Sequence, residues 1–194
     1  MAEIESTRIA IRGSKAWTIE DYKKIDFSLE SGWQKAIDIF EDRIRGRFLD
    51  VIDRIEGIDG AGFAVMALDS LLVETLQQFR EGKAETPYRM SGEYFRRFLT
   101  STSFNTNFDV KKADLFYDQI RCGILHQAEV KTSSKIQTKE EIPLVSEDKS
   151  GGVVINRRKF HKKMERVFRE YLDALRKSDP PDGPLRQNFK DKMD

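Results

Sequence analysis

The chain has 194 residues, a length that suits one domain with a sizeable hydrophobic core. Hydrophobic residues make up 39% of it and charged residues 35%, and 34 basic residues balance 33 acidic ones, which excludes an overall attraction for nucleic acid. The one cysteine, Cys122, excludes an internal disulfide, and no CxxC or paired His-Cys pattern offers a zinc cage.

The first segment, 1–30, has a mixed composition and is expected to be an N-terminal extension. Thr7–Arg12 alternates between apolar and polar residues, which predicts one short strand that ends at Gly13. The chain opens with acids, without a basic and apolar leader, and no apolar run approaches the roughly 18 residues of a membrane span. We therefore expect a cytoplasmic protein with no membrane contact.

From Ser31 the apolar residues recur at spacings of four and three, with charged residues between them, which predicts a long amphipathic helix with one buried stripe. The predicted stripe consists of Trp33, Ile37, Phe40, Ile44, Phe48, Val51 and Ile55.

Ala61–Phe79 predicts a central core helix, because its only charged residues are Asp69 and Glu74. A carboxylate inside an apolar helix needs a partner, so we expect both acids to be buried and paired.

Two further helices are expected in the middle of the chain. Ser91 is a candidate N-cap for a short helix that buries Tyr94, Phe95, Phe98 and Leu99 and turns Arg96 and Arg97 outward. Asp109 is a candidate N-cap for another, with a buried line of Phe116, Ile120, Ile124 and Ala128.

Short β-like runs between Thr132 and Asn156 predict a small hairpin. A last helix is expected from Asn156, with Phe160, Met164, Val167, Tyr171 and Leu175 buried, and 178–194 is expected to be a flexible tail. The predicted fold is mainly all-α: a four- to five-helix bundle over 31–177 with a small β-hairpin insertion before the last helix.

The stretch Arg121-Cys122-Gly123-Ile124-Leu125-His126 places an arginine and a histidine late in an apolar helix, with four residues between them. A helical bundle with Arg-x4-His near the end of a late helix resembles the HEPN superfamily. The phrases Phe63–Ala67, Leu71–Leu76 and Ile120–Glu129 also look like uncharacterised bacterial HEPN-type proteins, and the resemblance spans about Trp33 to Lys177.

The resemblance implies a metal-independent endoribonuclease without a cofactor, with Arg121 and His126 as catalytic residues. It also implies a homodimer in which the motifs of two subunits share one cleft. Such domains recur in bacterial defence and toxin–antitoxin systems, so RNA or a nucleotide and an antitoxin-like protein are the implied partners. One departure from the family pattern is Cys122, where active members often carry a polar residue after the arginine.

The residue types suit that chemistry. His126 titrates near neutral pH and can serve as base or acid, whereas Arg121 is always charged and suits a phosphate. Five residues of regular helix rotate by about 500°, which leaves the two side chains about 140° apart. Either the helix loosens near His126 or a second subunit completes the site. Gly123 lies between them, and a glycine inside a helix is expected where packing or access requires a close approach.

Each residue also has an ordinary structural interpretation. Arg121 at a surface would pair with Asp118. Asp69 and Glu74, the possible supporting residues, would orient His126 or hold Arg121, or else pair with another buried donor. Cys122 and His126 have metal-ligand spacing, but too few further ligands exist for zinc, so no metal site is expected.

The last predicted helix begins with a strongly basic run, which favours binding of a phosphate backbone. A solvated face is the competing interpretation of this run, and His161 is assigned to that face. The candidate RNA-binding residues are Arg157, Arg158, Lys162, Arg166 and Arg169.

Three functions stay open at this level. The leading hypothesis is a HEPN-like endoribonuclease or RNA-binding protein. The alternatives are a non-catalytic HEPN-like module that binds a nucleotide or a protein, and a purely structural helical adaptor.

Overall fold

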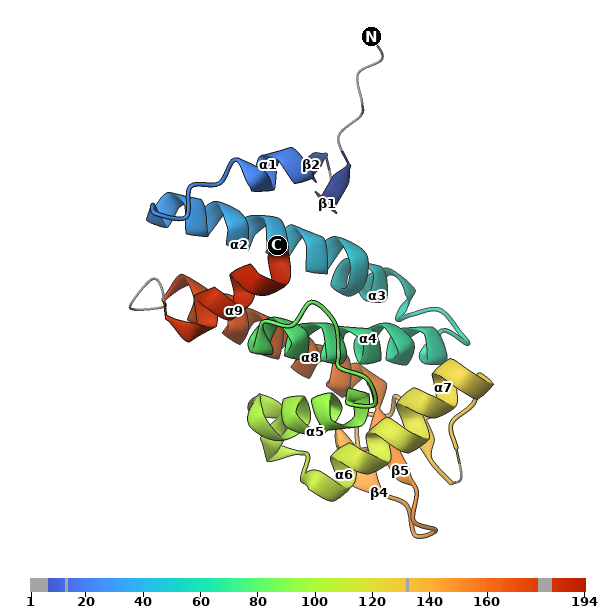
Figure 1. Cartoon of the computed structure of the whole chain (residues 1–194). Helices are drawn as coiled ribbons and strands as arrows, with labels where there is room; N and C mark the ends of the chain where they lie inside the picture. The colour runs from blue at the N-terminus through green and yellow to red at the C-terminus, as the bar shows by residue number, and fades with distance from the viewer. Residues whose placement is uncertain (1–6, 13, 132, 178–182) are drawn as a thin grey trace.

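The computed structural model describes residues 7–12, 14–131, 133–177 and 183–194, and it is mainly helical with small sheets, which confirms the predicted fold class in this coarse form. Figure 1 shows a stack of three tiers. At one end, helix α2 (Glu30–Ile44) and α3 (Asp50–Ile55) lie beneath a β-hairpin; α4 (Gly62–Glu81) and α8 (Arg157–Arg176) cross the middle. The other end holds α5 (Ser91–Ser101), α6 (Val110–Leu115) and α7 (Cys122–Gln127).

The N-terminal extension forms a hairpin of β1 (Arg8–Arg12) and β2 (Lys15–Thr18), followed by the short helix α1 (Ile19–Lys23). The predicted strand is therefore present, and it has an antiparallel partner. Thr18 caps α1 with a reciprocal hydrogen-bond pair to Asp21, which satisfies two backbone N–H groups at the start of the helix.

The predicted long helix continues from α2 through a π-helical turn, η1 (Arg45–Leu49), into α3. Ile37, Phe40 and Ile44 are fully buried as predicted, but Leu49 and Ile52 replace Phe48, Val51 and Ile55 as the fully buried residues. A π turn holds about one more residue than an α turn, so it moves the buried stripe by one position. The sequence prediction was wrong about this second half of the stripe.

Helix α4 lies at the centre of the bundle and packs against α5, α8 and α9 (Pro184–Met193). Its end is set by Gly82, whose φ of 63° puts the backbone in the left-handed region that favours glycine. The predicted burial of Asp69 is confirmed, since its side chain is fully buried, and Glu74 is largely buried.

The middle helices follow the sequence closely, with two differences. Asp109 caps α6 through the backbone N–H of Lys112, as predicted. Ser91 is the first residue of α5 and not its N-cap: Met90 holds the N-cap position without a side-chain cap, and the Ser91 hydroxyl donates a hydrogen bond to Glu74. Helices α6 and α7 are joined by a second π-helical turn, η3 (Phe116–Arg121), and Ala128 lies outside the buried line as the C-cap of α7.

The segment before α8 forms a three-stranded sheet in the order β3-β5-β4, where the sequence predicts a two-stranded hairpin. β4 (Val145–Glu147) pairs antiparallel with β5 (Val153–Asn156), and β3 (Lys135–Gln137) pairs parallel with β5 on its other edge. The last helix begins beside Asn156, as predicted, and the Asn156 side chain caps α8 by accepting the backbone N–H of Lys159.

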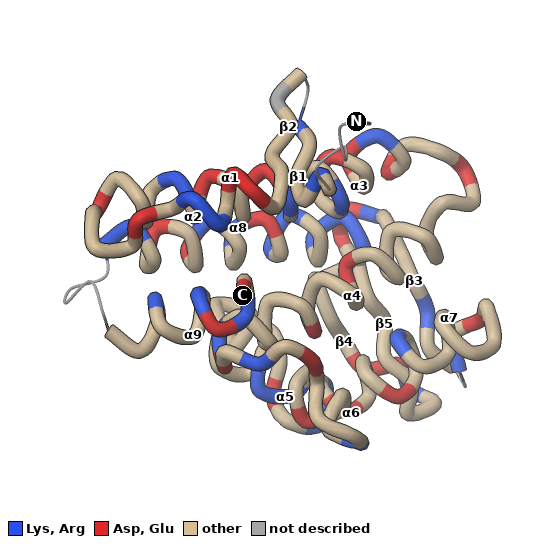
Figure 2. The backbone as a smooth tube through the Cα atoms, turned by 45° about the horizontal axis from the view of Figure 1, so that its top comes forward, with Lys and Arg blue, Asp and Glu red and all other residues tan. Residues whose placement is uncertain are grey.

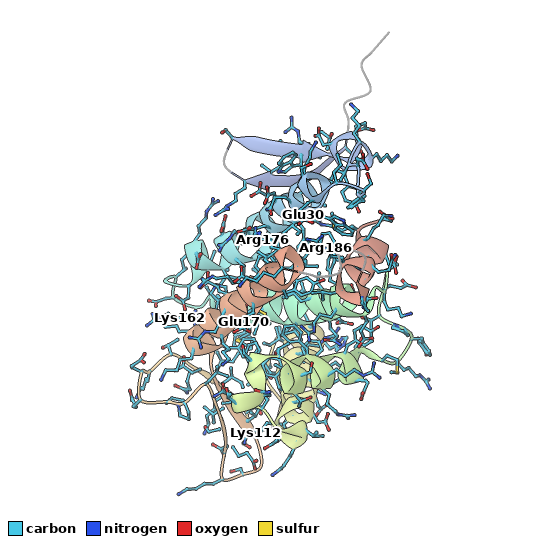
Figure 3. All side chains as sticks on the ribbon, turned by 90° about the vertical axis from the view of Figure 1, so that its left-hand side faces the viewer. Glu30, Lys112, Lys162, Glu170, Arg176 and Arg186 are labelled. Carbon is cyan, nitrogen blue, oxygen red and sulfur yellow. The ribbon has the colours of Figure 1, made fainter. Side chains whose placement is uncertain are left out.

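The described end of the segment predicted to be a flexible tail, 183–194, instead contains helix α9, which begins with proline at its first position. Phe189 is fully buried against Phe40 and Phe79, with ring centroids 5.3 and 5.9 Å away. Arg186 is 1% exposed, and its guanidinium binds both carboxylate oxygens of Glu30 at 2.6 and 2.7 Å (Figure 3). One ring and one ion pair thus anchor a helix too polar to be recognised from its composition.

None of the helices in the described part of the chain combines the length and the apolar character that a membrane span needs.

Candidate functional site

Arg121, the first predicted catalytic residue, lies at the end of η3 and faces α4. Its Nη2 lies 3.3 Å from Oε2 of Glu74, and the Ser91 hydroxyl donates a 2.8 Å hydrogen bond to Oε1 of the same carboxylate. The side chains of Arg121 and Glu74 are only 16% and 13% exposed. Glu74 therefore holds Arg121, one of the two supporting roles that the sequence suggested, and Ser91 orients Glu74.

Two aromatic rings complete the surroundings of Arg121. The guanidinium carbon lies 5.5 Å from the ring centre of Tyr117 and 6.0 Å from that of Phe95, within the range of cation–π attraction. The Sγ of Cys122 lies 4.0 Å from Nη1 of Arg121. Burial and the adjacent Cys122 raise the pKa of Tyr117. The guanidinium is thereby held in place by Glu74 and two aromatic rings, with its side chain 16% exposed.

His126, the second predicted catalytic residue, lies on α7 and is exposed. The helix loosens in η3, which ends at Arg121, and Cys122–Gln127 is regular α-helix. Arg121 and His126 therefore keep different directions around the axis, and nothing in the described residues joins their side chains. The structure brings Arg121 to Glu74, but it does not bring either of them to His126.

Gly123 has a packing reason for being glycine. After α7 the chain reverses at Ala128, whose φ of 55° is left-handed, and it passes back over the helix. A Cβ on Gly123 would lie 2.4 Å from the carbonyl oxygen of Glu129, and the N–H of Lys131 donates to the carbonyl of Gln119 at 2.9 Å. This close approach involves the chain's own loop and fixes the end of the helix beside His126.

Asp118 is not the partner of Arg121, so the ordinary surface pairing considered from the sequence is wrong. Asp118 instead binds Nζ of Lys131 at 3.0 Å, and its side chain is 63% exposed. Residues i and i−3 share a face only on a regular α-helix, and η3 interrupts that register.

Asp69, the other supporting candidate, serves neither Arg121 nor His126. It lies five residues before Glu74, so it faces the opposite side of α4. There its Oδ1 lies 3.0 Å from Nδ1 of His161 on α8. The competing interpretation, in which Asp69 pairs with another buried donor, is therefore correct for Asp69.

The prediction that His161 belongs to a solvated face is wrong, because its side chain is 4% exposed. His161 precedes Met164 and Phe168 by three and seven residues, which places it on the buried stripe of α8. That spacing, together with a buried acid that needs a partner, was the signal available in the sequence. The basic residues around His161 concealed it.

Burial opposes protonation of His161, but its hydrogen bond to Asp69 and the nearby carboxylates of Glu165 and Asp53 prevail and raise the pKa of His161. Burial also raises the pKa of Asp69, against the opposing effect of the His161 hydrogen bond. The Nε2 of His161 lies 3.6 Å from Oδ1 of Asp53 on α3. Ligand atoms of Asp53, His161 and Glu165 all lie within 4.8 Å of one another, so within the described part of the chain this group could hold a metal ion.

The basic run on α8 divides into one buried residue and an exposed row. Arg157 is 8% exposed and donates to the backbone carbonyl of Glu56 at 3.0 Å, so its assignment to an RNA-binding surface is wrong. The exposed row follows one side of the helix at intervals of four and three residues and consists of Arg158, Lys162, Arg166 and Arg169. Figure 3 shows Lys162 on the outer side of α8.

Lysine and arginine residues and aspartate and glutamate residues are distributed together along most helices, as the blue and red segments of the backbone in Figure 2 show. Some of the best-formed pockets in the described residues lie away from Arg121 and His126. One of about 340 Å³ lies where α8 and α9 meet α4 and the turn after α5, and its lining includes Arg80, Glu170 and Tyr171. Neither Arg121 nor His126 therefore lines one of these pockets.

No family model matches this chain, and neither a curated protein nor a solved structure shows significant similarity to it.

Proposed function

We propose that this chain is a HEPN-like RNA-binding protein that cleaves RNA without a metal ion, using Arg121 and His126 in a homodimer. The observation that carries the proposal is the fixed position of Arg121 against Glu74 and two aromatic rings, five residues before an exposed histidine. A guanidinium fixed in advance stabilises developing phosphorane charge without reorganisation, and an exposed imidazole is accessible to the 2′-hydroxyl.

The separation of Arg121 and His126 favours a site shared between two copies. Since regular α-helix keeps the two side chains about 140° apart, a single chain does not present both to one phosphate. A two-fold axis beside α7 brings Arg121 of one subunit to His126 of the other. In this proposal Glu74 and Ser91 are positioning residues, and the exposed row on α8 attracts the RNA backbone.

The test is cleavage of a mixed RNA pool by the purified chain in EDTA, with Arg121→Ala and His126→Ala run beside the parent. We expect both variants to lose activity while their circular dichroism spectra stay unchanged. When the two inactive variants are mixed and exchange subunits, about half of the dimers contain one subunit of each variant. One of the two shared sites in such a dimer is intact, so about one quarter of the parent activity returns. Loss that is not restored on mixing contradicts the shared site, and full activity in His126→Ala contradicts the catalytic role.

A non-catalytic module that binds a nucleotide or a protein, such as an antitoxin-like partner, is the second candidate. The Arg121–Glu74 ion pair favours it, because this pair already neutralises the guanidinium, and His126 has no orienting partner in the described residues. Under this proposal RNA stays intact, and a nucleotide raises the melting temperature of the parent but not of Arg121→Ala.

A further inference from the structure

We propose that Asp53, His161 and Glu165 form a site for a divalent transition-metal ion such as Zn²⁺, with Asp69 orienting the imidazole. This inference goes beyond the proposed function, because it concerns the opposite side of α4 and residues that RNA cleavage does not use.

The carrying observation is the unpartnered Nε2 of His161. This atom is buried and has no hydrogen-bond partner, although the whole histidine is only 3% exposed. A buried nitrogen without a partner is costly, and it is rare unless a water, an ion or a function accounts for it. The Nε2 faces Oδ1 of Asp53 at 3.6 Å, which is longer than a hydrogen bond.

Asp69 prepares His161 for metal binding. Its Oδ1 lies 3.0 Å from Nδ1 of His161, and a neutral imidazole that donates Nδ1–H to this carboxylate keeps its lone pair on Nε2, the atom 3.6 Å from Asp53. Metal-bound histidines commonly donate their second nitrogen to a carboxylate in this way, which fixes the ring and increases its basicity. The side chain of Asp69 is completely buried, so the orientation is rigid.

The spacing of the ligand atoms suits a small ion. Zinc bonds to nitrogen and oxygen of about 2.0–2.2 Å at tetrahedral angles separate neighbouring ligand atoms by about 3.4 Å. The three candidate ligand atoms lie within 4.8 Å of one another, and the shortest measured separation to Nε2 is 3.6 Å. His161 and Glu165 are one turn apart on α8 and so share a face of the helix.

The charge balance points the same way. Three carboxylates surround one imidazole, and no lysine or arginine within the described ranges forms an ion pair with Asp53, Asp69 or Glu165. Two basic residues at the start of α8 are engaged with Glu56 instead: Arg158 lies 3.9 Å from its carboxylate, and Arg157 binds its backbone carbonyl. A cation here offsets repulsion between the carboxylates and links α3 to α8.

The ligand set decides the class of ion. An imidazole with two carboxylates favours zinc or manganese over magnesium and calcium, which prefer oxygen alone. Asp53 is 56% exposed, so one side of the site opens to solvent and leaves room for water as a further ligand.

The experiment is isothermal titration of ZnCl₂, and separately MnCl₂, into the full chain after EDTA treatment and dialysis. We expect one ion per chain and a rise in melting temperature on binding. Asp53→Asn and Glu165→Gln keep the side-chain shapes, and each weakens binding at least about tenfold. Glu170→Gln, on the exposed side of the same helix, is the matched control and binds as the parent does.

A second control addresses the other possible source of zinc binding. Cys122 and His126 are one turn apart, so the double variant Cys122→Ser/His126→Ala reports binding at that pair. The proposal is overturned if the folded parent binds neither ion, if Asp53→Asn and Glu165→Gln bind as tightly as the parent, or if only the double variant loses binding. RNA cleavage in EDTA is measured in parallel and stays at the parent level in Asp53→Asn, so failure of one proposal is distinguishable from failure of the other.

Discussion

The two histidines of this chain differ in burial, since His126 is exposed and His161 is buried, and helix α4 carries one acidic residue near each region. Glu74 faces a half-buried Arg121 whose helix continues to the exposed His126, whereas Asp69 faces the buried His161. The motif at 121–126 is the more conspicuous one in the sequence, but His161 has the more elaborate surroundings: one carboxylate in hydrogen-bond contact and two more nearby. A sequence motif and a set of charged groups around a buried side chain are therefore separate arguments for function.

The largest expected difference between the two regions is in stability. Asp69→Ala leaves His161 buried without its hydrogen-bond partner, so we expect the free energy of unfolding to fall by about 3 kcal/mol. His126→Ala removes an exposed side chain and changes it by less than about 0.5 kcal/mol. Urea denaturation of both variants measures the contrast, and equal losses would show that the buried pair does not stabilise the fold.

The next effect concerns the close approach at the end of α7. Gly123→Ala introduces a Cβ 2.4 Å from the backbone oxygen of Glu129, so the loop after α7 must move. We expect a loss of about 1–3 kcal/mol, typical of overpacking, with faster hydrogen exchange in α7 and little change near His161. Ser101→Ala, at an exposed position on α5, controls for substitution in general. Unchanged exchange at 122–131 would contradict the packing role of Gly123.

A smaller effect is expected at Glu74. Glu74→Gln keeps the shape and the hydrogen bond from Ser91 but removes the charge opposite Arg121, which costs about 1 kcal/mol because the pair is only partly shielded from water. If Arg121 binds RNA phosphate, the same variant releases the guanidinium and tightens RNA binding at low salt. Fluorescence anisotropy with a labelled oligonucleotide measures this, and unaltered affinity would separate Glu74 from the RNA site.

The smallest expected effect is a dependence of stability on pH in EDTA. Because the folded-state pKa of His161 is raised above 6.5, its contribution is fully present below pH 6.5 and is lost as the pH rises through the raised pKa. The raised pKa of Asp69 acts with the same sign. Urea midpoints across pH 6–9 for the parent and for His161→Gln check it; a midpoint that rises with pH only in the parent would contradict the assigned direction.

Much of the fold could be predicted from local patterns. Apolar spacing located the helices that became α2–α3, α4, α5, α6–α7 and α8, and the cap at Asp109 and the start of the last helix near Asn156 were correct. These features depend on neighbouring residues, whose periodicity and hydrogen-bonding capacity are written along the chain. The burial of Asp69 followed equally from its apolar neighbours, and the resemblance behind Arg121 and His126 stays a prediction.

Tertiary structure decided what depends on distant partners. The π turn η1 moved the buried stripe of α2–α3 by one position, and β3 pairs directly with β5 although β4 lies between them in the sequence. Helix α9 is held to the bundle because Phe189 packs against Phe40 and Arg186 pairs with Glu30. His161 lies inward, where it contacts the buried Asp69 on helix α4. A buried charged or aromatic side chain stabilises the fold only when a complementary group lies beside it. That group comes from a distant part of the chain, so the spacing of neighbouring residues does not predict the contact.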